Sequence, residues 1–240
     1  GNYQAKGLFS YGYNYAGRPG MAQTQLANAL LTWEKNASFD LGLEFGLFNS
    51  LTGVINYYQR KSDGLLLEDP LSFTTGFENI TKNIGELMNS GVEIELTNIN
   101  LQTTDWTWIT SVNITSNKNE WTSLPQEEIL NGSKLWKVGT GSYEYDIREW
   151  AGVDPATREP MWYMDVLDEN DNPTGERTLT KSYSEADRYM QGPANPKFFG
   201  GFSNQLSWKN FSFDFSFYFS YGGQMLDYDQ MDVLHDGATP

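Results

Sequence analysis

An eleven-residue run, residues 211–221, alternates strictly between aromatic and mostly polar side chains. All six odd positions are aromatic, and four of the five even positions are Ser or Asp. A period of two places the rings on one face of a β-strand and the polar groups on the other, whereas a helix would scatter the rings around its axis. The run therefore predicts a strand with one wholly aromatic face.

The length of this predicted strand matches the thickness of a membrane. Eleven residues at about 3.3 Å each, tilted by about 45°, cover about 25 Å, the height of the apolar band of outer-membrane barrels. The aromatic face lies either against lipid or against a second sheet, and the run alone does not decide between them. The residues predicted to face lipid in the first case are Phe211, Phe213, Phe215, Phe217 and Phe219.

Five further segments alternate in the same way, although less regularly, and all nine prolines lie outside the six alternating stretches. Tight connections alternate with long ones, the longest being a loop over about residues 117–197. Tight turns on one rim and long loops on the other are typical of up-and-down outer-membrane barrels, and a soluble sandwich has no reason to sort its loops in this way. The predicted strands cover about residues 34–48, 51–63, 91–99, 105–116, 198–208 and 211–222.

Composition narrows the class of protein further. No apolar run approaches the roughly 18 residues of a membrane helix, which excludes a helical membrane protein and leaves a membrane β-barrel open. A net charge of −15 argues against nucleic acid as a partner, because phosphate contacts require Lys and Arg. There is no cysteine, so disulfides and thiolate metal sites are absent.

The sequence offers little for catalysis. The single histidine is His235, so neither a Ser-His-Asp arrangement nor a histidine zinc site can be assembled within the chain. Asp165, Asp168, Glu169 and Asp171 are close in sequence, but they lack the spacing of an EF-hand, and a solvated turn is the favoured interpretation. We therefore predict no enzyme activity, no catalytic residue, no cofactor and no metal site.

The long loop is rich in aromatic side chains. Exposed rings stack on the apolar faces of sugars or pack against partner proteins, whereas a long ordered loop also needs a buried anchor of its own. Both interpretations stay open for the candidate substrate or partner contacts, which are Trp136, Trp150, Trp162 and Tyr163. Within this loop, residues 161–166 and 178–181 predict a hairpin, and residues 182–185 predict the start of a short helix.

Four segments of the chain, taken in order, match the pattern of a known family. Trp150-Ala-Gly-Val-Asp-Pro-Ala-Thr-Arg-Glu-Pro-Met-Trp-Tyr163 resembles the segment Ala-Gly-Val-Asp-Pro-x-Thr-Gly-x-Pro-x-Tyr of SusC/RagA-type TonB-dependent outer-membrane transporters, with Arg158 standing where that family usually has Gly. Together the segments span about residues 30–226. The other three are Leu31-Thr-Trp-Glu34, Asn83-Ile-Gly-Glu-Leu-Met-Asn-Ser-Gly-Val-Glu93 and Pro196-Lys-Phe-Phe-Gly-Gly-Phe-Ser203.

The resemblance implies an all-β fold, an antiparallel up-and-down segment of a transmembrane barrel of about 22 strands with long extracellular loops. It also implies TonB-energised import across the cell outer membrane of a bulky nutrient, either an oligosaccharide or a peptide, beneath a SusD-like surface lipoprotein. The family's N-terminal plug, which engages the TonB complex, is not visible here, so we expect a C-terminal part of the barrel. The alternative is a secreted all-β glycan-binding module that uses its loop aromatics to hold sugars.

Overall fold

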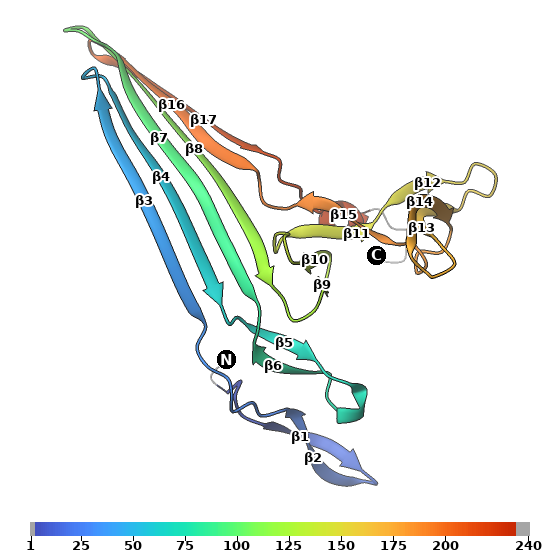
Figure 1. Cartoon of the computed structure of the whole chain (residues 1–240). Coiled ribbons are helices and arrows are strands. Elements are labelled where there is room, and N and C mark those ends of the chain that lie inside the picture. The colour runs from blue at the N-terminus through green and yellow to red at the C-terminus, as the bar shows by residue number, and fades with distance from the viewer. Residues whose placement is uncertain (1–2, 234–240) are drawn as a thin grey trace.

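The computed structural model describes residues 3–233, and most of this range is β-strand. Six long strands form one antiparallel sheet in the order β3-β4-β7-β8-β16-β17, so each strand pairs with the long strands before and after it (Figure 1). This up-and-down order is the predicted one, and within the described residues no second sheet lies against these strands. Their bounds are β3 (Lys35–Leu47), β4 (Leu51–Asp63), β7 (Glu86–Gln102), β8 (Trp106–Ser123), β16 (Phe198–Trp208) and β17 (Phe211–Tyr221).

The connections are sorted by length between the two ends of the sheet (Figure 1). Three tight turns, at residues 48–50, 103–105 and 209–210, lie at one end. In the first of them, Phe48 and Asn49 both adopt left-handed backbone conformations, with φ of 55° and 57°. The long connections, residues 64–85 and 124–197, lie together at the other end. One rim of the sheet is therefore compact and the other carries nearly all of the loop mass.

The two faces of the sheet differ in chemistry. Cross-strand partners share a face of the sheet, and the register pairs Phe215 with Asn204 and Asn204 with Thr110. The face on which these three residues lie carries most of the apolar side chains of all six strands. This face is uncovered: Phe211 is 71% exposed and Leu41 is 62% exposed. Among the described residues, the only buried apolar ones are Trp121 and Ala186, and neither lies on this face. The sheet therefore lacks the second layer that a soluble sandwich requires.

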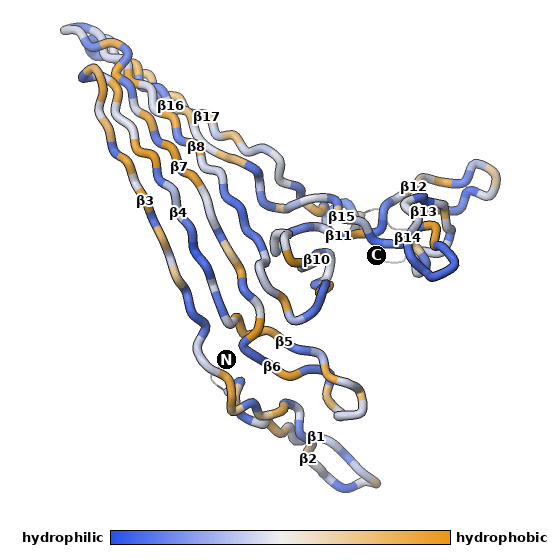
Figure 2. Tube along the Cα trace, in the orientation of Figure 1, coloured by the Kyte–Doolittle hydropathy of each residue, from blue (hydrophilic) through white to orange (hydrophobic). Residues whose placement is uncertain are grey.

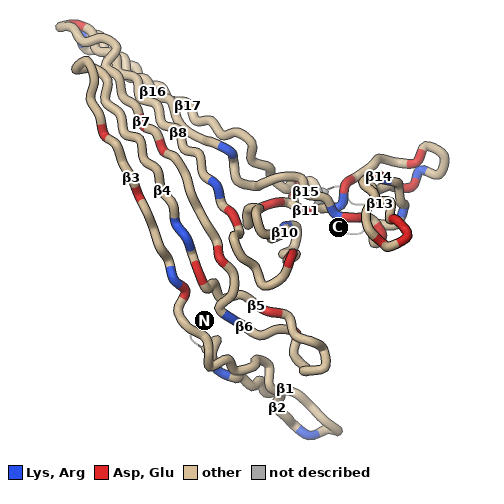
Figure 3. Tube along the Cα trace, viewed as in Figure 1, with Lys and Arg blue, Asp and Glu red and all other residues tan. Residues whose placement is uncertain are grey.

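The opposite face is polar and acidic. Because side chains alternate along each strand, five carboxylates lie on this face of the six strands, compared with one cation, Arg60. Figure 2 shows hydrophobic residues recurring along the strands, and Figure 3 shows charges sparse there and gathered in the loops. The carboxylates on this face are Asp40, Glu44, Glu93, Glu95 and Asp214.

Two strands are longer than the alternating pattern predicts. β7 begins at Glu86 rather than residue 91, and β8 continues to Ser123 rather than residue 116. The added residues are mostly polar, and they stay in the sheet because β4, β7 and β8 keep pairing as far as Asp63 and Ser123. An ion pair of 2.7 Å between Lys61 and Glu86 supports this extension.

The loop end is built from hairpins and small sheets. The hairpin of β1 (Leu8–Tyr15) and β2 (Arg18–Gln25) precedes the six strands, and β5 (Leu66–Pro70) and β6 (Asn79–Asn83) form the connection between β4 and β7, with a 3-10 turn over Phe73–Thr75 at its tip. A helix, α1 (Tyr228–Val233), follows β17. Within residues 3–233 no helix has the length and apolar character needed to cross a membrane.

The long loop after β8 contains two more sheets. A four-stranded sheet has the order β15-β11-β10-β9, and a three-stranded sheet has the order β12-β13-β14. Their bounds are β9 (Glu128–Asn131), β10 (Lys134–Lys137), β11 (Glu144–Arg148), β12 (Trp150–Val153), β13 (Pro160–Leu167), β14 (Pro173–Thr180) and β15 (Arg188–Pro193). The hairpin predicted from residues 161–166 and 178–181 is β13–β14.

The helix predicted to start at Ser182 was wrong. Residues 183–185 form a turn, and β15 begins soon afterwards at Arg188. The Glu185 carboxylate accepts a hydrogen bond from the Thr180 hydroxyl at 3.2 Å instead of reaching back to the Ser182 backbone. The Ser182 N–H donates to that same hydroxyl at 3.1 Å, so the reciprocal pair of a capping box is not formed.

Candidate functional site

The long loop is attached to the sheet through Trp121, near the end of β8. The Trp121 N–H donates to the Thr140 carbonyl, and its own carbonyl accepts from the Gly139 N–H, both at 2.9 Å. The Trp121 ring packs against Trp136 with 4.9 Å between ring centroids, and the Trp136 indole N–H donates to the Ser142 carbonyl at 3.1 Å. Trp136, a candidate contact residue, is therefore part of the small core that anchors the loop.

Two other candidates form a second aromatic cluster. Trp150 on β12 lies directly opposite Trp162 on β13, with ring centroids 5.8 Å apart at 80°. Trp162 in turn packs edge-on against Tyr183 at 5.4 Å. Trp150 is 54% exposed, so one side of this cluster faces solvent. Tyr163, the fourth candidate, is next to Trp162 on the same strand, so it points to the other face and pairs with Leu179.

The structure thus divides the four predicted contact residues. It brings Trp150 and Trp162 together, assigns Trp136 to the loop anchor, and directs Tyr163 away from the other aromatic rings. None of the four lines the pocket that lies on the four-stranded loop sheet.

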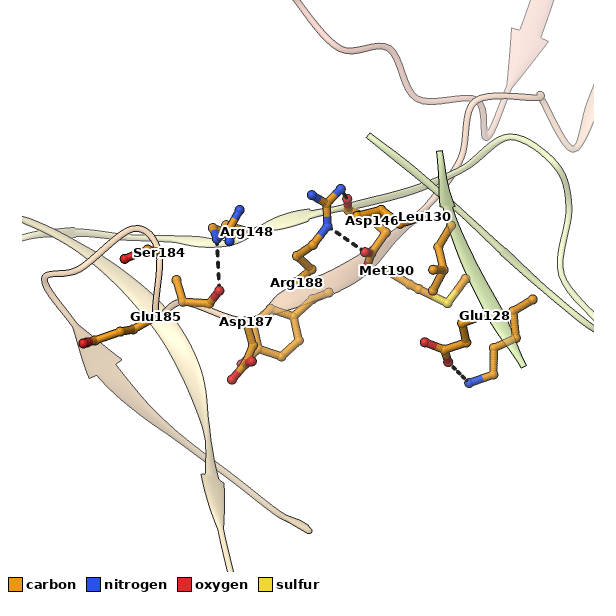
Figure 4. A pocket seen from close by; sticks show the side chains of 13 residues that line it. Glu128, Leu130, Asp146, Arg148, Ser184, Glu185, Asp187, Arg188 and Met190 are labelled. Carbon is orange, nitrogen blue, oxygen red and sulfur yellow. Dashed lines mark hydrogen bonds and ion pairs between the residues drawn. The ribbon is translucent and has the colours of Figure 1, made fainter. Parts of the chain in front are cut away.

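That pocket has a volume of about 690 Å³ and lies on the four-stranded loop sheet (Figure 4). The turn that precedes β15 closes one side of it. Arg148 on β11 and Arg188 on β15 are direct cross-strand partners and extend to the same side of their strands. Its floor is partly apolar, because Leu130 is 53% exposed and Met190 is 44% exposed within it.

The carboxylates that line the pocket all have partners. Asp146 is buried and accepts from the Arg188 Nε at 2.9 Å, and Glu128 pairs with Lys137. The Asp187 carboxylate accepts from the Asp165 N–H at 2.7 Å, and the Glu185 carboxylate accepts from the Thr180 hydroxyl at 3.2 Å. These bonds leave the pocket without a free acid pair of the kind that general acid–base chemistry needs.

Arg148 is held differently from Arg188. Its Nε donates to the Ala186 carbonyl at 3.0 Å, and its guanidinium lies 4.5 Å from the centroid of the Tyr183 ring. Among the described residues no carboxylate forms an ion pair with Arg148. Sequence reasoning missed this residue because the alternation of β11 covers only five residues, a short signal within the long loop.

Burial and neighbouring charge act on one tyrosine of the pocket. Tyr189 donates its hydroxyl to Asp165 at 2.9 Å, and burial together with this carboxylate raises the pKa of Tyr189 to about 12. Its ring also carries the guanidinium of Arg177 at 3.9 Å from the centroid. The phenol therefore stays protonated at neutral pH and has a structural role.

The acidic turn that follows β13 shows no metal-binding geometry. The Asp168 carboxylate accepts from the N–H groups of Asn172 at 3.0 Å and Asn170 at 2.8 Å, which lower its pKa and close the turn. In the described part of the chain, no three acidic or histidine side chains come together as a possible metal-binding group. His235 lies outside the described residues.

Comparison with known proteins agrees with the fold. No family model matches the sequence. The chain is 32% identical over 236 residues to TonB-dependent receptor P3 of Formosa agariphila, an alignment that covers 92% of the chain and 23% of that relative. It is 31% identical over 200 residues to TonB-dependent receptor SusC of Bacteroides thetaiotaomicron, covering 79% of the chain and 19% of SusC.

Solved structures give the same result. The RagAB peptide importer in its open-open state superposes with a TM-score of 0.75 at 28% identity, covering 93% of this chain and 24% of that one. The closed-closed state of RagAB gives a TM-score of 0.74 at the same identity. These relatives and neighbours are named as receptors, importers or transporters, and none is named as an enzyme.

The continuous antiparallel sheet, its sorted loops and these relatives define the chain as part of a TonB-dependent receptor. Within that class the chain belongs to the SusC/RagA type, as the four ordered sequence segments imply. It spans about a quarter of the length of the curated relatives P3 and P39.

Proposed function

We propose that this protein imports a bulky nutrient, an oligosaccharide or a peptide, across the cell outer membrane of a Gram-negative bacterium. The observation that carries the proposal is the six-stranded sheet with one uncovered apolar face. Burying such a face requires lipid or a second sheet, and the structure has no second sheet against it. The sequence similarity to TonB-dependent receptors and the structural similarity to the RagAB importer support a role in transport.

In this proposal the six long strands cross the outer membrane, with the tight turns in the periplasm and the long loops outside the cell. Lipid contacts the aromatic face of β17, formed by Phe211, Phe213, Phe215, Phe217 and Phe219. Trp106 and Trp208, whose rings stack at 5.6 Å beside two of the tight turns, form part of the aromatic girdle at the membrane surface.

The partners in this proposal are a SusD-like lipoprotein that covers the loops and the TonB complex, engaged through an N-terminal plug region. The segment between β8 and β16 supports the first assignment, because its two ordered sheets present an aromatic cluster that includes the exposed Trp150 and the pocket beside Arg148. Energy for uptake comes from TonB, and the chain itself carries out no chemistry.

Deleting Asn131–Gln191 from the full-length receptor tests this proposal. We expect a normal amount of folded barrel in the outer membrane, because the deletion leaves all six long strands intact. We also expect reduced growth on the cognate nutrient and reduced co-purification of the lid lipoprotein. Normal growth with the lipoprotein still bound would contradict the proposed role of this loop.

A further inference from the structure

Arg148 is a preorganised cation without a counter-charge. The Ala186 carbonyl bonds its Nε, and the Tyr183 ring supports its guanidinium from one face. Tyr183 is itself held by Trp162, which packs against Trp150. The terminal guanidinium nitrogens make no hydrogen bond to any described residue, so two donors in the fork geometry that suits a carboxylate face the pocket.

The surroundings of Arg148 leave it uncompensated. Arg188, its direct cross-strand partner, is a like charge that is neutralised by the buried carboxylate of Asp146. The other lining carboxylates are bonded elsewhere, Glu128 to Lys137, Asp187 to a backbone N–H and Glu185 to the Thr180 hydroxyl, and none of them forms an ion pair with Arg148. A half-buried guanidinium that no carboxylate balances favours an incoming anion.

The rest of the pocket indicates what kind of molecule bears that anion. Leu130 and Met190 expose aliphatic and thioether surface on the same side as Arg148, and such surface adapts to varied side chains. The one aromatic ring among the lining residues, Tyr189, carries the Arg177 guanidinium over one face, which leaves at most its other face for stacking against a sugar. A peptide fits this combination of surfaces better than a glycan does.

We propose that Arg148 is the anion-binding residue of this pocket and that it binds a carboxylate of a short peptide, with an apolar side chain of that peptide over Leu130 and Met190. This inference rests on the proposed function and narrows its substrate class to peptides. Trp150 and Trp162 then act through Tyr183, as support for the guanidinium.

A competition experiment on the full-length receptor tests the assignment. The probe is a tryptic digest of casein mixed with an equal amount of the same digest whose carboxyl groups have been converted to isotopically labelled methyl esters. Peptides retained by the detergent-purified receptor are quantified by mass spectrometry. We expect about tenfold enrichment of free acids over esters, the loss expected when a charge-assisted bond to Arg is removed.

Variants separate the role of Arg148 from a general charge effect. Arg148→Gln should abolish the enrichment, and Arg148→Lys should retain part of it because the charge remains while the fork geometry is lost. The matched control is Arg158→Gln, which removes the same charge from the turn between β12 and β13, outside the residues that line the pocket. That variant should retain the full enrichment.

Three results would overturn the inference. These are equal retention of acids and esters by the unmodified receptor, equal loss of enrichment in the Arg158→Gln control, and retention of an oligogalacturonate probe with no retention of peptides. The outcome is separable from the proposed function: a receptor that supports growth on its nutrient but shows no preference for acids keeps the transport role and loses this substrate class.

Discussion

Phe215 lies in the middle of β17, where its ring contacts its neighbours along the strand and on β16. Its centroid is 5.5 Å from that of Phe213, 5.9 Å from Phe217 and 6.5 Å from Phe202. We expect Phe215→Arg to reduce the amount of assembled receptor, because a charge at the lipid midplane costs about 2–4 kcal/mol. The heat-modifiable band in outer-membrane fractions measures the effect.

The neighbouring residue provides a control of the same size and charge. Ser216 lies one position along the strand and therefore on the polar face, so Ser216→Arg should leave the heat-modifiable band near its normal intensity. An undiminished band in Phe215→Arg would contradict the lipid contact proposed for the aromatic face.

Arg158 adopts a backbone conformation that usually favours glycine. This position, where the resembling family usually has Gly, has a left-handed conformation with φ of 62°. The Arg158 N–H donates to the Asp154 carbonyl at 2.7 Å, and the Asp154 carboxylate accepts from the Ala156 N–H at 2.8 Å. These bonds offset the roughly 1–2 kcal/mol that a side chain costs in this conformation.

The turn between β12 and β13 is tied to the end of β14 by a small ionic cluster. The Lys181 ammonium lies 2.7 Å from both the Asp154 and the Glu159 carboxylates. Hydrogen bonds donated by Lys181 lower the pKa of both Asp154 and Glu159. The Thr157 hydroxyl lowers both as well, and the Ala156 N–H adds to the effect on Asp154. The pKa of Lys181 is raised by the same two carboxylates.

The sign of the pH effect follows from these directions. In the folded loop the pKa of Asp154 lies below its ordinary value of 3.8 and that of Glu159 below 4.5. Both carboxylates therefore stabilise the folded loop when the pH is above these ordinary values, and the contribution is lost as the pH falls through the folded pKa. Lys181 contributes fully below its ordinary value of 10.5, so it sets no acid limit. We therefore expect the turn to loosen below about pH 4.

Hydrogen exchange of the Arg158 amide, corrected for its intrinsic pH dependence, measures this loosening. Protection should decrease between pH 5 and pH 3 in the unmodified receptor, and Lys181→Gln should lower it already at pH 6. Lys137→Gln, which breaks a similar pair in the neighbouring loop sheet, should leave this amide unchanged. Constant protection across the range would show that the cluster contributes nothing to the turn.

Secondary-structure elements differed in how far side-chain patterns could predict them. β16 and β17 match the predicted ranges closely because alternation runs along their whole length. The outer ends of β7 and β8 and most of the short strands of the loop do not alternate between apolar and polar residues, and β11 alternates over only five residues. Their pairing depends on backbone hydrogen bonds to partners such as Ser133 and Thr140, which lie in separate loop segments. Such pairing leaves little local signal.

At the scale of the whole molecule, solubility separates the transporter from a secreted glycan-binding module. The uncovered apolar face includes exposed large side chains on every one of the six strands, for example Leu41 and Phe217 at 62% and 63%. We expect the purified chain to aggregate in buffer and to become monodisperse only in detergent, because lipid or detergent must cover this face. Size-exclusion chromatography with and without detergent measures the difference. A monodisperse chain in buffer alone would favour the secreted module.

The sequence by itself determined the strand class, the up-and-down order and the sorting of loops, because a period of two and the placement of turns are local properties of the chain. It also carried four segments that imply the family to which the comparisons assign the chain. Only the tertiary structure decided that Trp136 anchors the loop while Trp150 and Trp162 pair. It also decided that, within residues 3–233, no second sheet covers the aromatic face and no carboxylate forms an ion pair with Arg148. These are relations between residues far apart in the chain, and only folding brings such residues into contact.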